Sequence, residues 1–378
     1  MNINPSIAPG LLTRWQSWRD QSLISADFRR RALRFWPSRW VARRRARALF
    51  DIVAGFVYSQ TLLACVQLRL FDRLAEGPMT ATALAAALEL PADATHRLLD
   101  AAAALGLVER RQRDLFGLGP LGVALVDNAG LAALVRHHAI LYADLQDPVA
   151  LLRGDRVGRL ASYWPYATSS TPDELPDDRV GAYSELMSAS QPLVADEVLS
   201  AYRLRQHACL MDVGGGEGRF LVSAAEREPH LRLILFDLPP VVERARARLG
   251  SLGLGGRGTF VGGNFLADPL PPGADVISLV RVVHDQSDDG ARHLMRAAFA
   301  ALPPGGVLLV AEPMARTRGA EPMGDAYFNL YLLAMGRGRP RSAAELTRLL
   351  HEAGFAEVEA RTTRLPLQCG LLVARKPG

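Results

Sequence analysis

Cysteine is scarce in this chain of 378 residues, which contains three: Cys65, Cys209 and Cys369. Each stands alone inside an apolar stretch, so the spacing of a disulfide framework or a zinc site is missing. This pattern favours reduced, buried thiols in a cytosolic protein. No other cluster of His, Cys, Asp and Glu has metal-ligand spacing, and we therefore expect no metal at the functional site.

Long hydrophobic runs are also missing. No uninterrupted apolar run reaches about 18 residues, the length that a membrane-spanning helix needs. The N-terminus lacks the basic-then-apolar pattern of a signal peptide. These absences predict a cytoplasmic protein without a transmembrane helix. Apolar residues nevertheless make up 49% of the chain, which is enough to build the cores of two domains.

Acidic side chains are rare at the start of the chain. The first fifty residues hold eleven Arg and two Asp, a local charge of +9, so the remainder of a chain with net charge +5 carries −4. Four of the five tryptophans lie there too: Trp15, Trp18, Trp36 and Trp40. Arg and Trp in a segment of mixed polarity are typical of elements at a membrane surface. Packing on a partner subunit and binding of nucleic acid are the alternatives.

The most informative pattern is L-M-D-V-G-G-G-E-G at Leu210–Gly218. An apolar run ends at Asp212, a glycine cluster follows, and a helical pattern begins at Arg219. Glycine lets the backbone turn sharply and approach a ligand closely. The dinucleotide spacing G-x-G-x-x-G does not fit, because the third glycine comes one position early. The pattern resembles instead the first motif of S-adenosylmethionine (SAM) methyltransferases, although glycine-rich turns also occur in α/β domains that bind nothing.

Further apolar runs follow at the spacing of a parallel sheet, and each leads into a polar side chain. Asp237 ends the second run, Asn264 and Phe265 end the third, His284 follows the fourth, and Glu312 ends the fifth. Ligands of such sheets bind beyond the carboxyl ends of the strands. We expect Asp237 to accept hydrogen bonds from ribose hydroxyls there, with Asn264 and Phe265 next to an adenine ring.

The residues ahead of the sheet predict helices. A long helical pattern at 48–74 is followed by helices at 80–88 and 94–105 and a two-stranded wing at 107–118, the order of a winged-helix fold. A helix that reads DNA presents polar and basic side chains, whereas the helix expected at 94–105 is mostly apolar, which favours packing against protein. We expect an arm at 1–45, a winged-helix-like domain at 46–180 and a sheet domain at 181–378.

With these motifs the chain resembles the plant-type, or family 2, O-methyltransferases over about residues 45–378. The stretches that carry the resemblance are D-V-G-G-G-E-G at 212–218, F-D-L-P at 236–239, G-N-F at 263–265, V-V-H-D-Q-S-D-D at 282–289 and L-P-P-G-G-V-L-L-V-A-E at 302–312. The resemblance implies an α/β fold, in which a seven-stranded Rossmann-like methyltransferase domain follows an all-α winged-helix-like dimerisation domain. It also implies SAM as the cofactor and a homodimer.

The stretches at 48–57, 135–152 and 187–196 are similar to family members that methylate hydroxylated acyclic carotenoids. The implied reaction is methylation of a tertiary C-1 hydroxyl on such a carotenoid. The arm at 1–45 would then suit contact with the inner, photosynthetic membrane, where this apolar substrate dissolves. A phenolic polyketide or a tetrapyrrole is the alternative acceptor. Two other classes are a SAM-binding winged-helix regulator of transcription and a catalytically silent SAM-fold partner.

The resemblance also assigns roles to residues. His284 would accept the proton of the acceptor hydroxyl, and Glu312 would orient its imidazole. The residues expected to bind the cofactor are Asp212, Gly214, Gly216, Gly218, Asp237, Leu238, Asn264, Phe265 and Arg281. The residues expected to line an acceptor pocket between the domains are His137, His138, Tyr142, Met187, Tyr327, Phe328, Tyr331 and Met335. Aromatic and Met side chains at helical spacing are more often simply part of a core.

Four positions depart from the family pattern. Asn264 stands where the family usually has Asp, Gln286 where it has Trp, and Val280 where a cofactor-contacting Lys is common. Pro340 takes the place of a second catalytic acid. Because a tertiary alcohol is far less acidic than a phenol, we expect its proton to leave during or after methyl transfer rather than before it.

Overall fold

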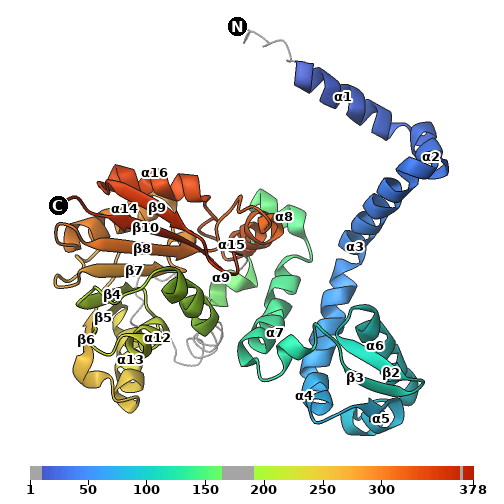
Figure 1. The fold of residues 1–378 in the computed structure, drawn as a ribbon, viewed down its shortest axis with the longest axis horizontal. Coiled ribbons are helices and arrows are strands. Elements are labelled where there is room, and N and C mark those ends of the chain that lie inside the picture. Colours follow the sequence, from blue (N-terminus) through green and yellow to red (C-terminus); the bar gives the residue numbers. More distant parts are fainter. Residues whose placement is uncertain (1–10, 164–190, 367–368) are drawn as a thin grey trace. The chain divides into compact units, whose positions relative to one another are not determined.

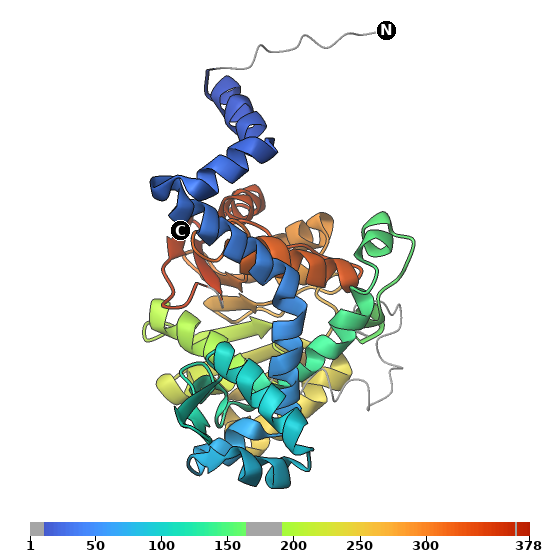
Figure 2. The same ribbon diagram turned by 90° about the vertical axis from the view of Figure 1, so that its right-hand side faces the viewer.

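The computed structural model describes residues 11–163, 191–366 and 369–378. The chain forms two compact units, Met1–Val126 and Asp127–Gly378. Figures 1 and 2 show the elements of each unit. Met187, an expected acceptor residue, lies outside the described residues.

The N-terminal unit has the predicted winged-helix order. Its helices are α1 (Leu11–Ile24), α2 (Ala26–Arg34), α3 (Trp36–Gln67), α4 (Leu70–Ala75), α5 (Ala81–Leu88), α6 (Ala92–Ala104) and the short η1 (Val123–Leu125). The wing is formed by β2 (Val108–Gln112) and β3 (Leu115–Leu118). A short strand, β1 (Met79–Thr80), pairs with β3 and completes an antiparallel sheet of order β1-β3-β2. The unit is therefore helical with a small sheet rather than purely helical.

Helix α3 begins twelve residues before the expected start at 48, because Pro37 in its first turn suits a helix N-terminus and the Arg-rich residues after it are good helix formers. By length and composition it is the one helix of the described residues able to cross a membrane, and 11% of its most apolar stretch is buried. The stretch is not an uninterrupted apolar run, because polar residues such as Asp51 lie within it. Within that stretch the exposed large apolar side chains are Leu49, Phe50, Ile52, Val53, Phe56 and Val57.

Three helices that the sequence analysis grouped with the N-terminal domain belong to the C-terminal unit: α7 (Ala129–Asp144), α8 (Pro148–Arg153) and α9 (Arg159–Tyr163). Leu141, Leu151 and Leu160 share a buried apolar cluster with Tyr331 and Met335. The buried Asp144 carboxylate joins α7 to α9, because it accepts the backbone N–H groups of residues 159 and 160 at 2.6 and 2.8 Å. These contacts place the boundary between the units near residue 127 instead of 180.

The C-terminal unit is built on the predicted seven-stranded sheet. Its strands are β4 (Cys209–Val213), β5 (Arg232–Asp237), β6 (Gly258–Gly262), β7 (Val276–Val280), β8 (Val307–Glu312), β9 (Glu357–Arg361) and β10 (Gly370–Arg375). Their order is β6-β5-β4-β7-β8-β10-β9. The strands β4, β5, β6, β7 and β8 run parallel to one another, whereas β10 is antiparallel to both β8 and β9. The order reverses between β4 and β7, where such sheets bind their ligands.

Helices cover both faces of this sheet (Figure 1). The helix at 191–201, α12 (Arg219–Arg227) and α13 (Pro239–Ser251) pack over one apolar core, and α14 (Asp288–Ala301) and α16 (Ala343–Ala353) pack over the other. Between β8 and α16, a π-helical turn, η5 (Pro322–Phe328), leads into α15 (Asn329–Ala334). The described unit also holds two short helical turns, η3 (Gly255–Arg257) and η4 (Val283–Asp285).

All three cysteines are buried and free, as expected. Burial raises the pKa of Cys65 and of Cys369 to about 12, so both thiols stay protonated at neutral pH. Their role is therefore that of small apolar side chains in the core.

Candidate active site

The carboxyl edge of the sheet carries the polar side chains that the sequence analysis placed there. Asp212, Asp237 and Glu312 lie at or next to the ends of β4, β5 and β8. His284 lies in η4, directly after β7, and Asn264 follows β6. Because these strands are parallel neighbours, their ends bring residues that are far apart in the sequence to one edge.

The glycine cluster forms a tight turn between β4 and α12. Gly214, Gly216 and Gly218 have φ values of 68°, 57° and 76°, in the left-handed region that favours glycine. A Cβ atom added to Gly218 would lie 2.6 Å from the Leu249 side chain, so this glycine is needed for packing. A Cβ added to Gly216 would meet no atom within 4 Å. The turn is therefore closed toward the core at Gly218 and open to a ligand at Gly216.

Two carboxylates flank this turn, the buried Asp212 and the half-buried Asp237. Asp212 accepts a hydrogen bond from the Ser278 hydroxyl at 2.6 Å through Oδ1, while its buried Oδ2 has no hydrogen-bond partner. Burial raises the pKa of Asp212 to about 7, against the effect of Ser278, and the charge of Asp237 adds to the rise. Asp237 accepts the N–H groups of Gly216 and Leu238 at 2.8 and 2.7 Å. Burial raises its pKa as well, although these two bonds oppose the shift.

The remaining expected cofactor residues lie near this edge in different environments. Phe265 faces the turn, since its ring lies 3.7 Å from the position of a Cβ on Gly214. Asn264 is exposed, and its side-chain oxygen accepts the N–H of Leu266 at 2.9 Å. Arg281 has a left-handed backbone with φ of 59°, an uncommon conformation for a non-glycine residue that is found most often at functional sites.

His284 is buried between two carboxylates, and its ring orientation is set by both. Its Nδ1 donates a short hydrogen bond to Oε2 of Glu312. Oε1 of Glu312 accepts the backbone N–H groups of Val282 and Val283 at 3.0 and 2.6 Å, so one carboxylate holds both the ring and its backbone turn. On the other side, Nε2 lies 3.1 Å from Oδ1 of Asp285, an ion pair without hydrogen-bond geometry.

These carboxylates determine the charge of the imidazole. Burial alone would lower the pKa of His284, but the charges of Asp285 and Glu312 outweigh it and raise the pKa to about 10. The ring is therefore an imidazolium at neutral pH and must release a proton before it can accept one. Glu312 was expected from the sequence as a partner of His284, whereas Asp285 was not, although it is the next residue in the chain.

Next to His284 lies a cluster of aromatic and imidazole rings contributed by α7, η5 and α15. The ring of Phe328 contacts His284 edge-on, with centroids 6.0 Å apart, and also contacts Tyr327 and Tyr331. Each tyrosine hydroxyl bonds to one histidine: Tyr331 to Nε2 of His137 at 2.9 Å and Tyr327 to Nε2 of His138 at 2.8 Å.

Two other expected acceptor residues do not take part in the histidine–tyrosine hydrogen bonds. Tyr142 contacts the ring of His138 edge-on at 6.5 Å, whereas Met335 is 1% exposed and lies in the core shared by α7, α8, α9 and α15. Together with the ring cluster, the structure brings seven of the eight expected acceptor residues into one region of the C-terminal unit.

The titratable members of this cluster are uncharged at neutral pH. Burial lowers the pKa of His137 to about 4, with a further contribution from His138, and it lowers the pKa of His138 as well. Burial also raises the pKa of Tyr327 to about 12, against the opposing charge of Arg281. The result is an aromatic surface with neutral hydrogen-bonding groups, directly beside the charged His284 cluster.

Within the described ranges, no three side chains of His, Cys, Asp or Glu are grouped closely enough to hold a metal ion. His284, Asp285 and Glu312 are groups that can transfer a proton and orient one another.

We expect the His284 imidazole to remain protonated through neutral pH and to titrate toward pH 10, and we expect Glu312→Gln to lower that pKa. Because the folded pKa lies above the ordinary value of 6.5, the resulting stabilisation is complete below about pH 6.5 and is lost as the pH rises through the folded pKa. Nitrogen-15 NMR of labelled histidine, with the signal assigned through His284→Gln, measures this titration. A His284 signal that titrates near pH 6.5 would contradict it.

Comparison with known proteins places this geometry in a family. A model of the O-methyltransferase domain matches residues 142–356, and a model of the O-methyltransferase dimerisation domain matches residues 50–128. The demethylspheroidene O-methyltransferase of Cereibacter sphaeroides is 45% identical over 344 residues, which cover 90% of this chain and 89% of the relative. The enzyme of the same name from Rhodobacter capsulatus is 43% identical over 336 residues, covering 89% and 84%.

Solved structures have the same architecture. The crystal structure of human N-acetylserotonin methyltransferase in complex with SAM superposes with a TM-score of 0.74 at 27% identity, covering 88% of this chain and 98% of that one. The two matched domains, the identity to the relatives and the overall fold all agree. The chain therefore belongs to the O-methyltransferase family, with the family's dimerisation domain ahead of its methyltransferase domain.

Proposed function

We propose that this protein is a SAM-dependent O-methyltransferase that methylates the tertiary C-1 hydroxyl of an acyclic hydroxycarotenoid. The observation that carries the reaction is the buried His284–Glu312 pair at the carboxyl edge of the sheet, between the glycine turn and the aromatic cluster. The two demethylspheroidene O-methyltransferases, each similar to most of this chain, support the choice of acceptor.

The residues around the glycine turn fit the cofactor. Both oxygens of Asp237 accept a backbone N–H and keep lone pairs for ribose hydroxyls. The unpartnered Oδ2 of Asp212 is suited to the ammonium group of the methionine portion, since a cation stabilises a buried carboxylate. Phe265 supplies an aromatic face for the adenine ring. Asn264 can still accept a second hydrogen bond through its side-chain oxygen, although its first is used by Leu266.

When bound, SAM supplies an electrophilic methyl group for direct displacement by the acceptor oxygen. The protein must hold that oxygen in line and remove its proton, and orientation alone can account for a large part of the rate. We propose that Nε2 of His284 receives the proton as the new carbon–oxygen bond forms. Before this step, the proton that the raised pKa retains on the ring must pass to solvent, and the contact of Nε2 with Asp285 must give way to the substrate.

The aromatic cluster suits a hydrocarbon that carries a single hydroxyl. Neutral rings on Tyr327, Phe328 and Tyr331 favour an apolar chain, and the uncharged His137 and His138 add no desolvation cost of a buried ion. Phe328 connects this surface to His284. An acceptor docked on it would therefore present its hydroxyl to the charged His284.

Replacing His284 by Ala should lower kcat for methylation of a detergent-solubilised 1-hydroxy carotenoid about 100-fold, within the range that general bases contribute. The dissociation constant of SAM should change less than about twofold, because the glycine turn is untouched. Kinetics with calorimetry of SAM binding measure the two effects. His293→Ala, an exposed histidine on α14, is the control. An unchanged kcat in His284→Ala would remove His284 from the reaction.

We also propose that the dimerisation domain forms a homodimer through the exposed apolar face of α3. Six large apolar side chains between Leu49 and Val57 are 48–78% exposed in the single chain, a patch that a monomer rarely leaves uncovered. The O-methyltransferase dimerisation model begins at residue 50, within the same stretch. Coverage by a second subunit accounts for the membrane-like composition of α3 without a transmembrane position.

Phe56→Glu should convert the dimer into monomers, because it places a charge in the middle of this face. Analytical ultracentrifugation measures the change, and Leu252→Glu, at an exposed apolar position of the C-terminal unit, is the matched control. A Phe56→Glu protein that remains dimeric would show that α3 is covered by something else.

The Arg/Trp arm at 1–45 is proposed to contact the membrane surface that holds the substrate. Trp15, Trp18, Trp36 and Trp40 are 54–84% exposed. Arg19 lies over the Trp15 ring at 5.5 Å and Arg44 over the Trp40 ring at 5.7 Å. Aromatic rings beside arginines can insert at the level of the lipid headgroups while the cations meet anionic phosphates. This would make a cytoplasmic enzyme a peripheral membrane protein.

Deleting residues 1–40 should lower the rate on carotenoid carried in anionic phospholipid vesicles several-fold more than the rate on detergent-solubilised carotenoid. The reason is that the arm assists loading and not chemistry. Initial rates in the two formats, with co-sedimentation on the same vesicles, measure the difference. Equal losses in both formats would argue instead for an arm that packs on the partner subunit.

A further inference from the structure

The segment that lacks the second catalytic acid wraps around the turn that carries His284. In R-G-R-P-R-S at 337–342, four donors reach the four consecutive backbone carbonyls of residues 283–286. Nη1 of Arg341 donates to Val283 at 2.8 Å, and Nη2 donates to Gln286 at 2.8 Å. Between them, the Arg339 N–H donates to His284 at 2.9 Å, and Nε of Arg337 donates to Asp285 at 3.4 Å.

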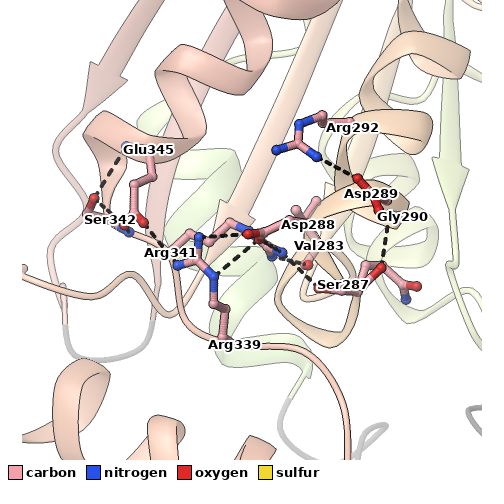
Figure 3. A network of polar contacts seen from close by, with 11 residues as sticks. Val283, Ser287, Asp288, Asp289, Gly290, Arg292, Arg339, Arg341, Ser342 and Glu345 are labelled. Atoms are coloured by element: carbon pink, nitrogen blue, oxygen red, sulfur yellow. Dashed lines mark hydrogen bonds and ion pairs between the residues drawn. The ribbon is translucent and has the colours of Figure 1, made fainter. Parts of the chain in front are cut away.

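Arg341 is the centre of this set of donors from Arg337, Arg339 and Arg341, which we call the clamp. Its residue exposure is 2%, which is rare for arginine and requires that its charge be paired. The partner is Asp288 at the start of α14, whose Oδ1 accepts from Nη2 at 2.7 Å and from Nε at 3.1 Å (Figure 3). One guanidinium therefore binds the carbonyls on both sides of η4 and the first turn of the following helix.

The position of Arg341 is itself fixed from two directions. Its carbonyl accepts the N–H of Ala315 at 3.1 Å, which ties it to the chain just beyond β8 and Glu312. The next residue, Ser342, caps α16 in a reciprocal pair of hydrogen bonds with Glu345 (Figure 3). Arg341 is thus attached to the chain that follows β8 and to the capped start of α16.

Close packing of residues 337–341 leaves little freedom for η4, the turn that carries His284. A Cβ added to Gly338 would lie 2.2 Å from the carbonyl oxygen of His284, so the segment packs directly against that backbone. On the opposite side, Glu312 accepts the N–H groups of Val282 and Val283. The turn is held through its N–H groups by Glu312 and through its carbonyls by residues 337–341.

We propose that Arg341 is a positioning residue for methyl transfer, which holds η4 so that Nε2 of His284 meets the acceptor hydroxyl. This inference rests on the proposed role of His284. In place of a second catalytic acid, residues 337–342 hold the His284 imidazole in a fixed position. A shift of about 1 Å in a catalytic group can cost about 100-fold in rate, so the clamp matters for turnover even though it does not touch the reactants.

The test compares Arg341→Gln, Arg341→Lys and the control Arg292→Gln, whose side chain pairs with Asp289 on α14 in the same region (Figure 3). We expect Arg341→Gln to lower kcat about 10- to 100-fold with the SAM dissociation constant changed less than about twofold, and Arg341→Lys to recover part of the loss. The apparent pKa of the pH–rate profile should also shift, because the distances from His284 to Asp285 and Glu312 change. Arg292→Gln should behave as the unchanged protein.

Asp288→Asn keeps the buried guanidinium but removes its carboxylate, and it decides the question if Arg341→Gln does not fold. It should lower kcat with an unchanged circular dichroism spectrum. The double variant Arg341→Gln with His284→Ala separates the two proposals. If Arg341 acts through His284, the double variant is about as slow as His284→Ala alone.

The positioning role would be overturned if the kcat losses of the two single variants multiply in the double variant. It would also be overturned if Arg341→Gln or Asp288→Asn has a normal kcat while His284→Ala is impaired. A normal kcat in His284→Ala would instead remove His284 from the reaction, and with it the proposed role on which this inference rests.

Discussion

The site depends on one buried carboxylate, Glu312 at the end of β8. It binds the imidazole of His284 through one oxygen and two backbone N–H groups of the catalytic turn through the other. A carboxylate that is 2% exposed is tolerated because each oxygen is satisfied. Removal of one partner from such a buried pair costs about 3–5 kcal/mol, so ring, turn and strand form one unit. The parallel sheet places this unit next to the glycine turn, where the methyl donor binds in the proposed mechanism.

Two contrasting environments meet at His284. On the strand side, three carboxylates, Asp212, Asp237 and Glu312, are each held by hydrogen bonds from serine, backbone or imidazole. On the helical side, the rings of η5, α15 and α7 are neutral. In the proposed mechanism this division separates a polar cofactor from an apolar acceptor, with the His284 imidazole between them. It suits a weakly acidic alcohol on a hydrocarbon, for which desolvation and alignment matter more than a strong acid–base pair.

Much of this arrangement could be predicted from the sequence, since it depends on local patterns. Apolar runs that end in Asp212, Asp237 and Glu312 gave the strands and their polar edge, and the glycine spacing gave the turn. Contacts between distant segments could not be read in the same way. The clamp of Arg341 on η4 and the docking of α7 to α9 on α15 depend on how helices pack. The length of α3 was underestimated because its first turns are rich in Arg and lack the apolar pattern of the rest of the helix.

The measurement that tests this account most directly is mass spectrometry of the product formed from SAM and a 1-hydroxy acyclic carotenoid, with NMR to locate the new methyl group. The account predicts one added methyl group for each tertiary hydroxyl that reacts, present as a methoxy group at C-1. Absence of product from a protein that binds SAM would contradict the carotenoid assignment, and methylation of a phenolic or tetrapyrrole acceptor under the same conditions would replace it.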